Sequence, residues 1–195
     1  RRAAEGLSEK YVALDIGASG KMLAPLGDFD FEEAVALFAE TVTCGVRHGA
    51  DLIVIETMND SYETKAALLA AKENSTLPVI VTNAYGENGK LMTGADADVM
   101  VAMLEGMGAD AIGANCSLGP DKLAPVIEEL LEYATVPVLL KPNAGMPEIK
   151  GGKTVFDITR DEFASTVASL ISKGAAIAGG CYGTTPEYIK ELTAL

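Results

Sequence analysis

Several residue types are scarce in this sequence of 195 residues. It contains no tryptophan, one histidine and three cysteines, and aromatic residues make up 6% of the chain. A small and odd number of cysteines does not suit a disulfide scaffold and is typical of the reducing cytosol, so we expect a cytoplasmic protein. No apolar run reaches the roughly 18 residues of a membrane span, and the chain does not start like a signal peptide. We therefore expect no membrane partner.

Basic residues are few relative to acidic ones. The chain has 15 lysines and arginines against 28 aspartates and glutamates, which gives a formal net charge of −13. A surface this acidic repels phosphate backbones, and no basic stripe in the sequence offsets it. We therefore expect no nucleic-acid partner.

The sequence is rich in small and aliphatic residues and carries an internal repeat. Hydrophobic residues make up 49% of the chain, which also holds 20 glycines. The segment His48–Asp51 (HGAD) recurs as Met107–Asp110 (MGAD) and, less well preserved, as Lys173–Ala176 (KGAA). A second motif, Leu77–Val79 (LPV), recurs as Val136–Val138 (VPV), and the copies of the two motifs alternate along the chain as landmarks. These landmarks follow one another about every 30 residues, the length of one strand, one helix and two loops. The repeat predicts an α/β fold of successive strand–helix units.

Continuous apolar runs after the landmarks predict parallel strands that are covered on both faces. The six predicted strands are Tyr11–Ile16, Leu52–Glu56, Val79–Asn83, Ala111–Cys116, Val138–Pro142 and Ala176–Cys181. Helical periodicity predicts six helices near residues 31–48, 61–73, 95–107, 120–133, 160–173 and 185–194.

Six strand–helix units with right-handed crossovers form either an open doubly wound sheet or most of an eight-stranded barrel. The regular period favours the (β/α)8 TIM barrel, of which about six units are then present in this chain. We expect residues 1–195 to be a single, partial barrel domain whose first two strands would precede Arg1, with Arg1–Lys10 as the end of a helix. Without those strands the sheet would have two uncovered edges, which would favour a homodimer.

Polar side chains follow the predicted strands at their carboxyl ends, where the active sites of such folds lie. These strand-end residues are Asp15, Glu56, Asn115, Cys116, Lys141, Asn143 and Cys181.

The thiols and carboxylates of this set each have two interpretations. Cys116 and Cys181 are either small apolar residues packed separately or, because alternate barrel strands contribute to the same interior layer, thiols that converge. Glu56 closes an otherwise apolar strand and needs either a ligand or an ion pair, for which Lys141 is available. The third cysteine, Cys44, lies within a predicted helix and is expected to be packed. The residues alone therefore predict a barrel enzyme with thiols and carboxylates at its mouth.

Two cysteine motifs resemble those of the homocysteine S-methyltransferase family. Gly113–Pro120 (GANCSLGP) is similar to the first motif, and Gly179–Pro186 (GGCYGTTP) is similar to the second, which normally reads GGCCGTTP. The segments Lys141–Pro147 (KPNAGMP), Asp15–Gly17 (DIG) and Ile55–Met58 (IETM) are similar too. Within the family, the likeness is to the homocysteine-binding module of cobalamin-dependent methionine synthase.

This resemblance implies a reaction and a set of partners. The family transfers a methyl group to the thiol of homocysteine, which gives methionine, and activates that thiol on a zinc ion held by three thiolates. By similarity Cys116 and Cys181 are zinc ligands, and Glu56 holds the substrate ammonium. The substrate-binding residues that the resemblance implies are Glu56, Asn115, Asp15 and Asn143. The implied methyl donor is methylcobalamin on a separate module or, as in relatives, betaine or a methylsulfonium compound. With methylcobalamin as donor, the expected partners are cobalamin- and folate-binding modules of a larger protein.

Tyr182 departs from the family pattern, because it stands where the family has its third zinc-binding cysteine. A phenol oxygen is a poorer zinc ligand than a thiolate, and its proton is harder to remove. The leading hypothesis is therefore an impaired homocysteine methyltransferase module. The alternative is a non-catalytic family member or fragment that binds homocysteine or a partner module without turnover. A third hypothesis is an unrelated barrel enzyme that uses Lys141 as a Schiff base.

Overall fold

The computed structural model describes residue 6 and residues 10–195. In this part of the chain six strands form one sheet in the order β1-β2-β3-β4-β5-β8, and every neighbouring pair is parallel. The strands of this sheet are β1 (Ala13–Ile16), β2 (Leu52–Met58), β3 (Val79–Asn83), β4 (Ala111–Asn115), β5 (Val138–Lys141) and β8 (Ile177–Ala178). The predicted α/β fold with parallel strands is confirmed.

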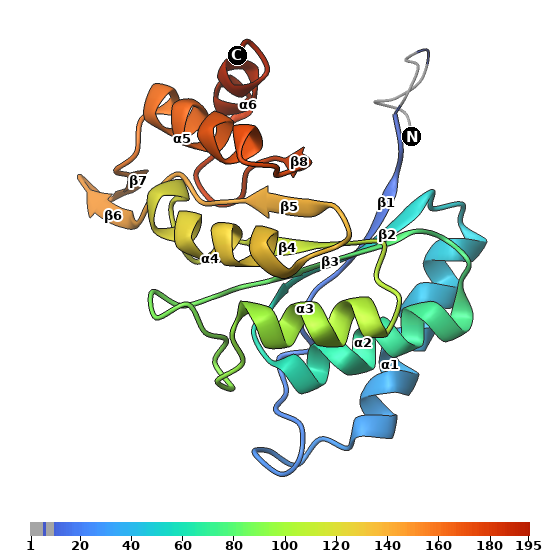
Figure 1. Cartoon of the computed structure of the whole chain (residues 1–195). Coiled ribbons are helices and arrows are strands. Elements are labelled where there is room, and N and C mark those ends of the chain that lie inside the picture. The colour runs from blue at the N-terminus through green and yellow to red at the C-terminus, as the bar shows by residue number, and fades with distance from the viewer. Residues whose placement is uncertain (1–5, 7–9) are drawn as a thin grey trace.

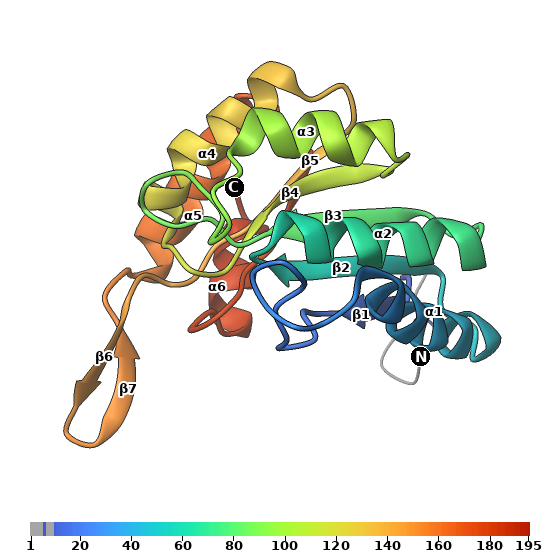
Figure 2. The same cartoon turned by 90° about the horizontal axis from the view of Figure 1, so that it is seen from below.

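A helix follows each strand of the sheet, as the repeat predicts. The helices are α1 (Phe31–Arg47), α2 (Ser61–Asn74), α3 (Ala97–Gly106), α4 (Pro120–Tyr133), α5 (Arg160–Ser172) and α6 (Pro186–Leu192). Helices α1 to α5 are arranged in an arc around the outside of the curved sheet, which is the arrangement of a (β/α)8 barrel traced over part of its circumference (Figures 1 and 2). The helix end predicted over Arg1–Lys10 falls, apart from Gly6 and Lys10, outside the described residues.

Local sequence signals fix where the helices begin and end. Asp30 caps α1 by accepting hydrogen bonds from the main-chain N–H groups of Glu32 and Glu33. Gly49 and Gly108 follow α1 and α3 with φ of 82° each, the left-handed conformation that ends a helix and that glycine adopts without a Cβ penalty. These signals explain why the predicted and observed helix ends agree within about two residues.

The core lies between the sheet and its arc of helices. In β2 the buried residues Ile53 and Ile55 alternate with half-buried ones, so one face of the strand lies under the helices. Helix α2 meets this face with fully buried alanines, namely Ala66, Ala67, Ala70 and Ala71. Because these side chains are small, the helix backbone packs close to the strands.

The sixth predicted strand is longer than the observed one. Only Ile177 and Ala178 form β8, whereas the expectation was Ala176–Cys181. These two residues pair with Leu139 and Leu140 along a single edge of β5. The next two residues, Gly179 and Gly180, have no side chains that could pack on a sheet face, so the strand ends there.

A β-hairpin that the sequence analysis missed follows β5. It consists of β6 (Pro147–Lys150) and β7 (Lys153–Phe156), which pair in antiparallel fashion and project from the body of the molecule (Figure 2). Gly151 and Gly152 form its two-residue turn with φ of 58° and 76°, the signature of a type I′ connection. The available signals were the Gly-Gly pair and the interval from Pro137 to Gly174, which at 37 residues is longer than the intervals of 29 or 30 residues before it.

Cys44 is exposed, so the prediction that it is packed is wrong. The fully buried Val42 lies two positions earlier in α1. Residues two positions apart do not share a face of a helix, so burial of the first does not bury the second. No helix in the described part of the chain is long and apolar enough to cross a membrane.

Candidate active site

The candidate residues on the strands lie on one face of the sheet, the face opposite the helices. Asp15 is in register with Val54, two residues before Glu56 on β2. Asn115 is likewise in register with Lys141. Because partners in a parallel register point to the same side and side chains alternate along a strand, the concave face collects these polar groups.

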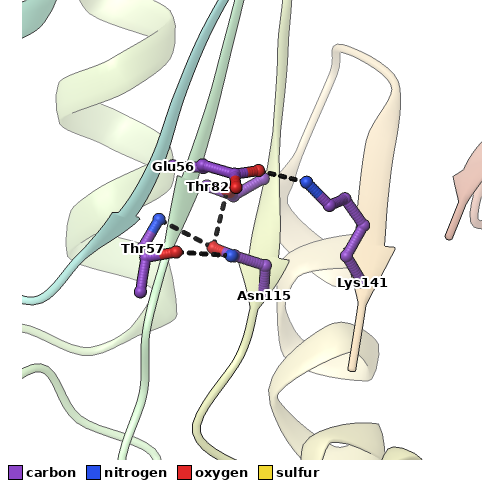
Figure 3. A network of polar contacts seen from close by, with 5 residues as sticks. All are labelled: Glu56, Thr57, Thr82, Asn115 and Lys141. Atoms are coloured by element: carbon purple, nitrogen blue, oxygen red, sulfur yellow. Dashed lines mark hydrogen bonds and ion pairs between the residues drawn. The ribbon is translucent and has the colours of Figure 1, made fainter. Parts of the chain in front are cut away.

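Glu56 and Lys141 form an ion pair across this face (Figure 3). The side chains of Glu56 and Lys141 are 21% and 26% exposed, so both charges remain within reach of a ligand. Strands β3 and β4 separate the two residues in the sheet, and it is the curvature of the sheet that brings the side chains together. Of the two interpretations of Glu56, the ion pair with Lys141 is therefore present.

Asp15 adds a second carboxylate to this pair. Although its side chain is largely exposed, partial burial and then the nearby Glu56 carboxylate raise its pKa, while Lys141 acts in the opposite direction. The three groups thus interact, with two acidic side chains and one basic side chain at the same place. Such an arrangement has an excess of negative charge that can accept a ligand cation.

Asn115 is fully buried and ties three strand ends together (Figure 3). Its Oδ1 accepts hydrogen bonds from the Thr57 main-chain N–H and the Thr82 hydroxyl, both at 2.8 Å, and its Nδ2 donates to the Thr57 hydroxyl at 2.7 Å. Thr57 has a φ of 59°, which is costly for a β-branched residue. The Asn115 amide therefore holds the residue after Glu56 in a strained conformation. No sequence pattern indicated this contact, although Thr57 follows the predicted strand Leu52–Glu56 and Thr82 lies in the predicted strand Val79–Asn83.

The thiols of Cys116 and Cys181 are brought together by the end of β5. The main-chain N–H of Cys116 donates to the Lys141 carbonyl at 3.0 Å, and that of Cys181 donates to the next carbonyl, Pro142, at 2.9 Å. Both cysteines are free and half-buried. A hydrogen bond from the Cys181 thiol lowers the pKa of Cys116 to about 6, helped by Ser117 and Asn143. The same bond raises the pKa of Cys181, so near neutral pH the pair holds one thiolate and one thiol.

The turn that carries Cys116 is itself strained. Cys116 and Ser117 have φ of 62° and 56°, two consecutive non-glycine residues in the left-handed region. The Ser117 hydroxyl donates to the Tyr85 carbonyl at 2.6 Å, and the Asn143 N–H donates to the Leu118 carbonyl at 2.9 Å. These contacts fix a backbone conformation that ends β4 at Asn115, one residue before the predicted strand end, and orients the thiol.

Tyr182 lies beside the thiols but is directed to solvent. Its side chain is 67% exposed, while its main-chain N–H donates to the Asn143 Oδ1 at 3.1 Å. A cavity of about 310 Å³ borders it, lined by Asn143, Pro147, Thr154, Phe156 and Tyr182. The hairpin that the sequence analysis missed therefore forms one wall of this cavity.

The donor atoms of the site fit zinc in part. Cys116 and Cys181 offer two soft sulfur ligands of the kind zinc prefers, and zinc binding would release the proton of the Cys181 thiol. Among the described residues, however, no group of three or more His, Cys, Asp or Glu side chains could hold a metal ion. The described residues thus offer two ligands at this place, where a catalytic zinc site has three protein ligands.

Comparison with known proteins identifies the family of this chain. The sequence model of the family described as homocysteine S-methyltransferase matches residues 1–195. The chain belongs to this family. Over 204 aligned residues it is 31% identical to the methionine synthase of Mycobacterium leprae and 30% identical to that of Mycobacterium tuberculosis, and it covers 17% of the length of each. Membership of the homocysteine S-methyltransferase family excludes the hypothesis of an unrelated barrel enzyme.

Solved structures confirm the TIM-barrel-like fold. The apo form of the homocysteine methyltransferase MmuM from Escherichia coli has a TM-score of 0.76 at 23% identity, covering 94% of this chain and 62% of that chain. The metallated form of the same enzyme has a TM-score of 0.71 at 23% identity, covering 86% of this chain and 53% of that chain. The chain therefore carries most, but not all, of the fold of this homocysteine S-methyltransferase relative.

Proposed function

We propose that this chain binds L-homocysteine and presents its sulfur for methylation, which gives methionine. The observation that carries the proposal is the meeting of the Cys116–Cys181 thiol pair and the Glu56 carboxylate at one mouth of a homocysteine S-methyltransferase fold. An amino thiol has an ammonium group and a sulfur at opposite ends, and the mouth offers a group suited to each end.

The side chains have distinct roles in this proposal. Glu56 accepts the substrate ammonium, and Asp15 supplies a second negative charge beside it. Asn143 links the Cys116 thiol to the backbone of Tyr182 and so lines the place where the substrate sulfur would lie. Asn115 acts through the residue that it holds, because both atoms of its amide are engaged with Thr57 and Thr82.

In this proposal the chain binds zinc, but weakly. Cys116 and Cys181 would be its ligands, and Tyr182 occupies the position of the third thiolate in the family motif. When bound, zinc lowers the pKa of a coordinated thiol, so that the thiolate predominates near neutral pH. The hydrogen bond from Cys181 keeps Cys116 ready as a thiolate, since the pKa of Cys116 is about 6.

The proposed methyl donor is methylcobalamin carried by a separate module. Because this chain spans 17% of the length of the methionine synthases that it matches, cobalamin- and folate-binding modules are the proposed partners.

A homodimer is also proposed. In the described part of the chain β1 and β8 are the edges of the sheet, and uncovered edges favour association with a second copy. Sedimentation velocity across a range of concentrations tests the homodimer.

Methyl transfer from free methylcobalamin tests the function directly. The chain is incubated with zinc, methylcobalamin and L-homocysteine, and methionine is measured by mass spectrometry. Methionine formation above the rate without protein, lost in Cys116→Ser, supports the proposed transfer. If calorimetry detects L-homocysteine binding but no methionine forms, the second candidate function, binding without turnover, replaces it. The observation that favours this candidate is that, among the described residues, the set of zinc ligands beside Tyr182 is incomplete.

A further inference from the structure

Lys141 is the charged residue of the mouth that the proposed function leaves without a role. Its ammonium pairs with Glu56, the carboxylate that would hold the substrate ammonium. Its charge also opposes the rise in the pKa of Asp15 that burial and Glu56 cause. A substrate cation that binds Glu56 must therefore compete with Lys141 for the same carboxylate.

The position of Lys141 joins the charged end of the mouth to the thiol end. Its main-chain carbonyl accepts the hydrogen bond from the Cys116 N–H at 3.0 Å, while its side chain extends to Glu56 (Figure 3). A short amino thiol that reached from the Cys116 thiol to Glu56 would therefore lie along this residue.

The aliphatic part of the Lys141 side chain packs over Gly179, which has no side chain to obstruct it. A Cβ atom at Gly179 would lie 3.1 Å from the Lys141 Cγ and 3.7 Å from its Cδ, so the lysine packs against bare backbone. A quarter of the Lys141 side chain is exposed, so the residue is in contact with the solvent from which a ligand would enter. A lysine ammonium is a compact charge on a flexible stem, which can exchange one carboxylate partner for another.

We infer that Lys141 binds the α-carboxylate of the amino-acid substrate and makes the site selective for a zwitterion; this inference rests on the proposed function. The substrate ammonium takes over Glu56, and the substrate carboxylate takes over Lys141. One internal ion pair is thus replaced by two ion pairs with the ligand. Every charge keeps a partner in this exchange, which matters because a partly buried charge that loses its partner is destabilising.

The exchange makes a prediction about ligands that a purely structural ion pair does not make. An amine thiol without a carboxylate would displace Lys141 from Glu56 and leave the lysine unpaired. A structural Lys141 that only neutralises Glu56 would instead affect all amine thiols alike. Comparing L-homocysteine with its decarboxylated analogue 3-aminopropane-1-thiol separates the two roles.

The experiment is calorimetric titration of the full chain and its variants with these two thiols. The native chain is expected to bind L-homocysteine about 10-fold or more tightly than 3-aminopropane-1-thiol. Lys141→Met should weaken L-homocysteine binding by about 10- to 100-fold, the loss of one charge-assisted contact, and leave binding of the analogue unchanged or tighter, because the analogue then has no lysine to displace from Glu56. Lys141→Arg, which keeps the charge, should retain most of the preference, and thermal unfolding of both variants checks that they fold.

The remaining outcomes overturn the inference in different ways. If Lys141→Met weakened the binding of both thiols equally, Lys141 would be only a structural partner of Glu56. If the variant bound L-homocysteine as tightly as the native chain, Lys141 would not belong to the binding site. In either case the proposed function stands, provided that Glu56→Gln weakens both thiols. If the native chain binds neither thiol, the proposed function fails and this inference fails with it.

Discussion

The side chain of Asn115 holds Thr57 by two hydrogen bonds, although 58 residues separate them in the sequence. One bond restrains the main-chain N–H of Thr57 and the other its hydroxyl, so the amide fixes both the backbone and the rotamer. Thr57 follows Glu56, and Asn115 precedes Cys116. A single buried amide therefore couples the carboxylate end of the candidate site to the thiol end.

Replacing Asn115 by leucine should destabilise the protein by about 2–4 kcal/mol, because the Thr57 N–H and Thr82 hydroxyl would be left buried without acceptors. Thr82→Val removes only one of these hydrogen bonds and should cost about 1 kcal/mol. Urea unfolding followed by circular dichroism measures both. If Asn115→Leu lowered the free energy of unfolding no more than Thr82→Val, the Asn115 amide would not restrain Thr57.

Tyr182→Cys should increase zinc binding by restoring the third thiolate of the family motif. Zinc affinity depends on ligand number and softness, so we expect near-stoichiometric zinc in the variant and substoichiometric zinc in the native chain after dialysis against a mild chelator. Elemental analysis gives zinc per chain, and Tyr182→Ser serves as the matched control without a thiol. Equal zinc in Tyr182→Cys and Tyr182→Ser would mean that the residue at this position does not face the metal.

The reactivity of Cys116 should rise with pH through a midpoint near 6. The pKa of this thiol is lowered to about 6 by the hydrogen bond from Cys181, and the thiolate is the reactive form. In zinc-free protein, alkylation by iodoacetamide should therefore be slow at pH 5 and reach its plateau near pH 7. Peptide mass spectrometry measures the rate at Cys116 separately from the rates at the other two cysteines.

Cys181→Ala is the control for this pH dependence. It removes the donor, so the midpoint at Cys116 should move up toward the ordinary thiol value of about 8.5. A midpoint near 8 or above in the native chain would show that the two thiols do not share a proton.

Gly113 allows β4 and β5 to approach closely enough to place Cys116. A Cβ atom at this position would lie 1.9 Å from the Leu139 carbonyl oxygen, so Gly113→Ala must force the strands apart. We expect a destabilisation of about 3 kcal/mol, measured by urea unfolding. Gly106, at the end of α3, has no atom within 4 Å of an added Cβ, and Gly106→Ala should stay within about 1 kcal/mol of the native chain. Similar effects of the two substitutions would contradict the close approach.

Much of the site could be predicted because strand ends are local features. Asp15, Glu56 and Asn115 stand at the ends of apolar runs, and parallel strands carry such residues to the same edge of a sheet. The convergence of Cys116 and Cys181 was one of two open interpretations. The structure selects it because both cysteines donate main-chain hydrogen bonds to the end of β5.

The features that escaped prediction depend on exceptions to local rules. The hairpin Pro147–Phe156 interrupts the repeat, and the strained Thr57 and Cys116 adopt backbone conformations that their residue types disfavour. Such conformations persist only where the surrounding contacts impose them. Sequence patterns that report average preferences cannot reveal them.

Three features can be read from the sequence alone: the parallel α/β fold, the edge of the sheet that carries the polar residues, and the motifs of the family. These follow from the alternation of side chains along a strand and from the period of strand–helix units, both of which are written in neighbouring residues. The folded chain was needed to establish that Glu56 pairs with Lys141, that Asn115 holds Thr57, and that the Tyr182 side chain faces solvent. Those contacts depend on the curvature of a sheet whose strands are far apart in the chain, and curvature is a property of the packed whole.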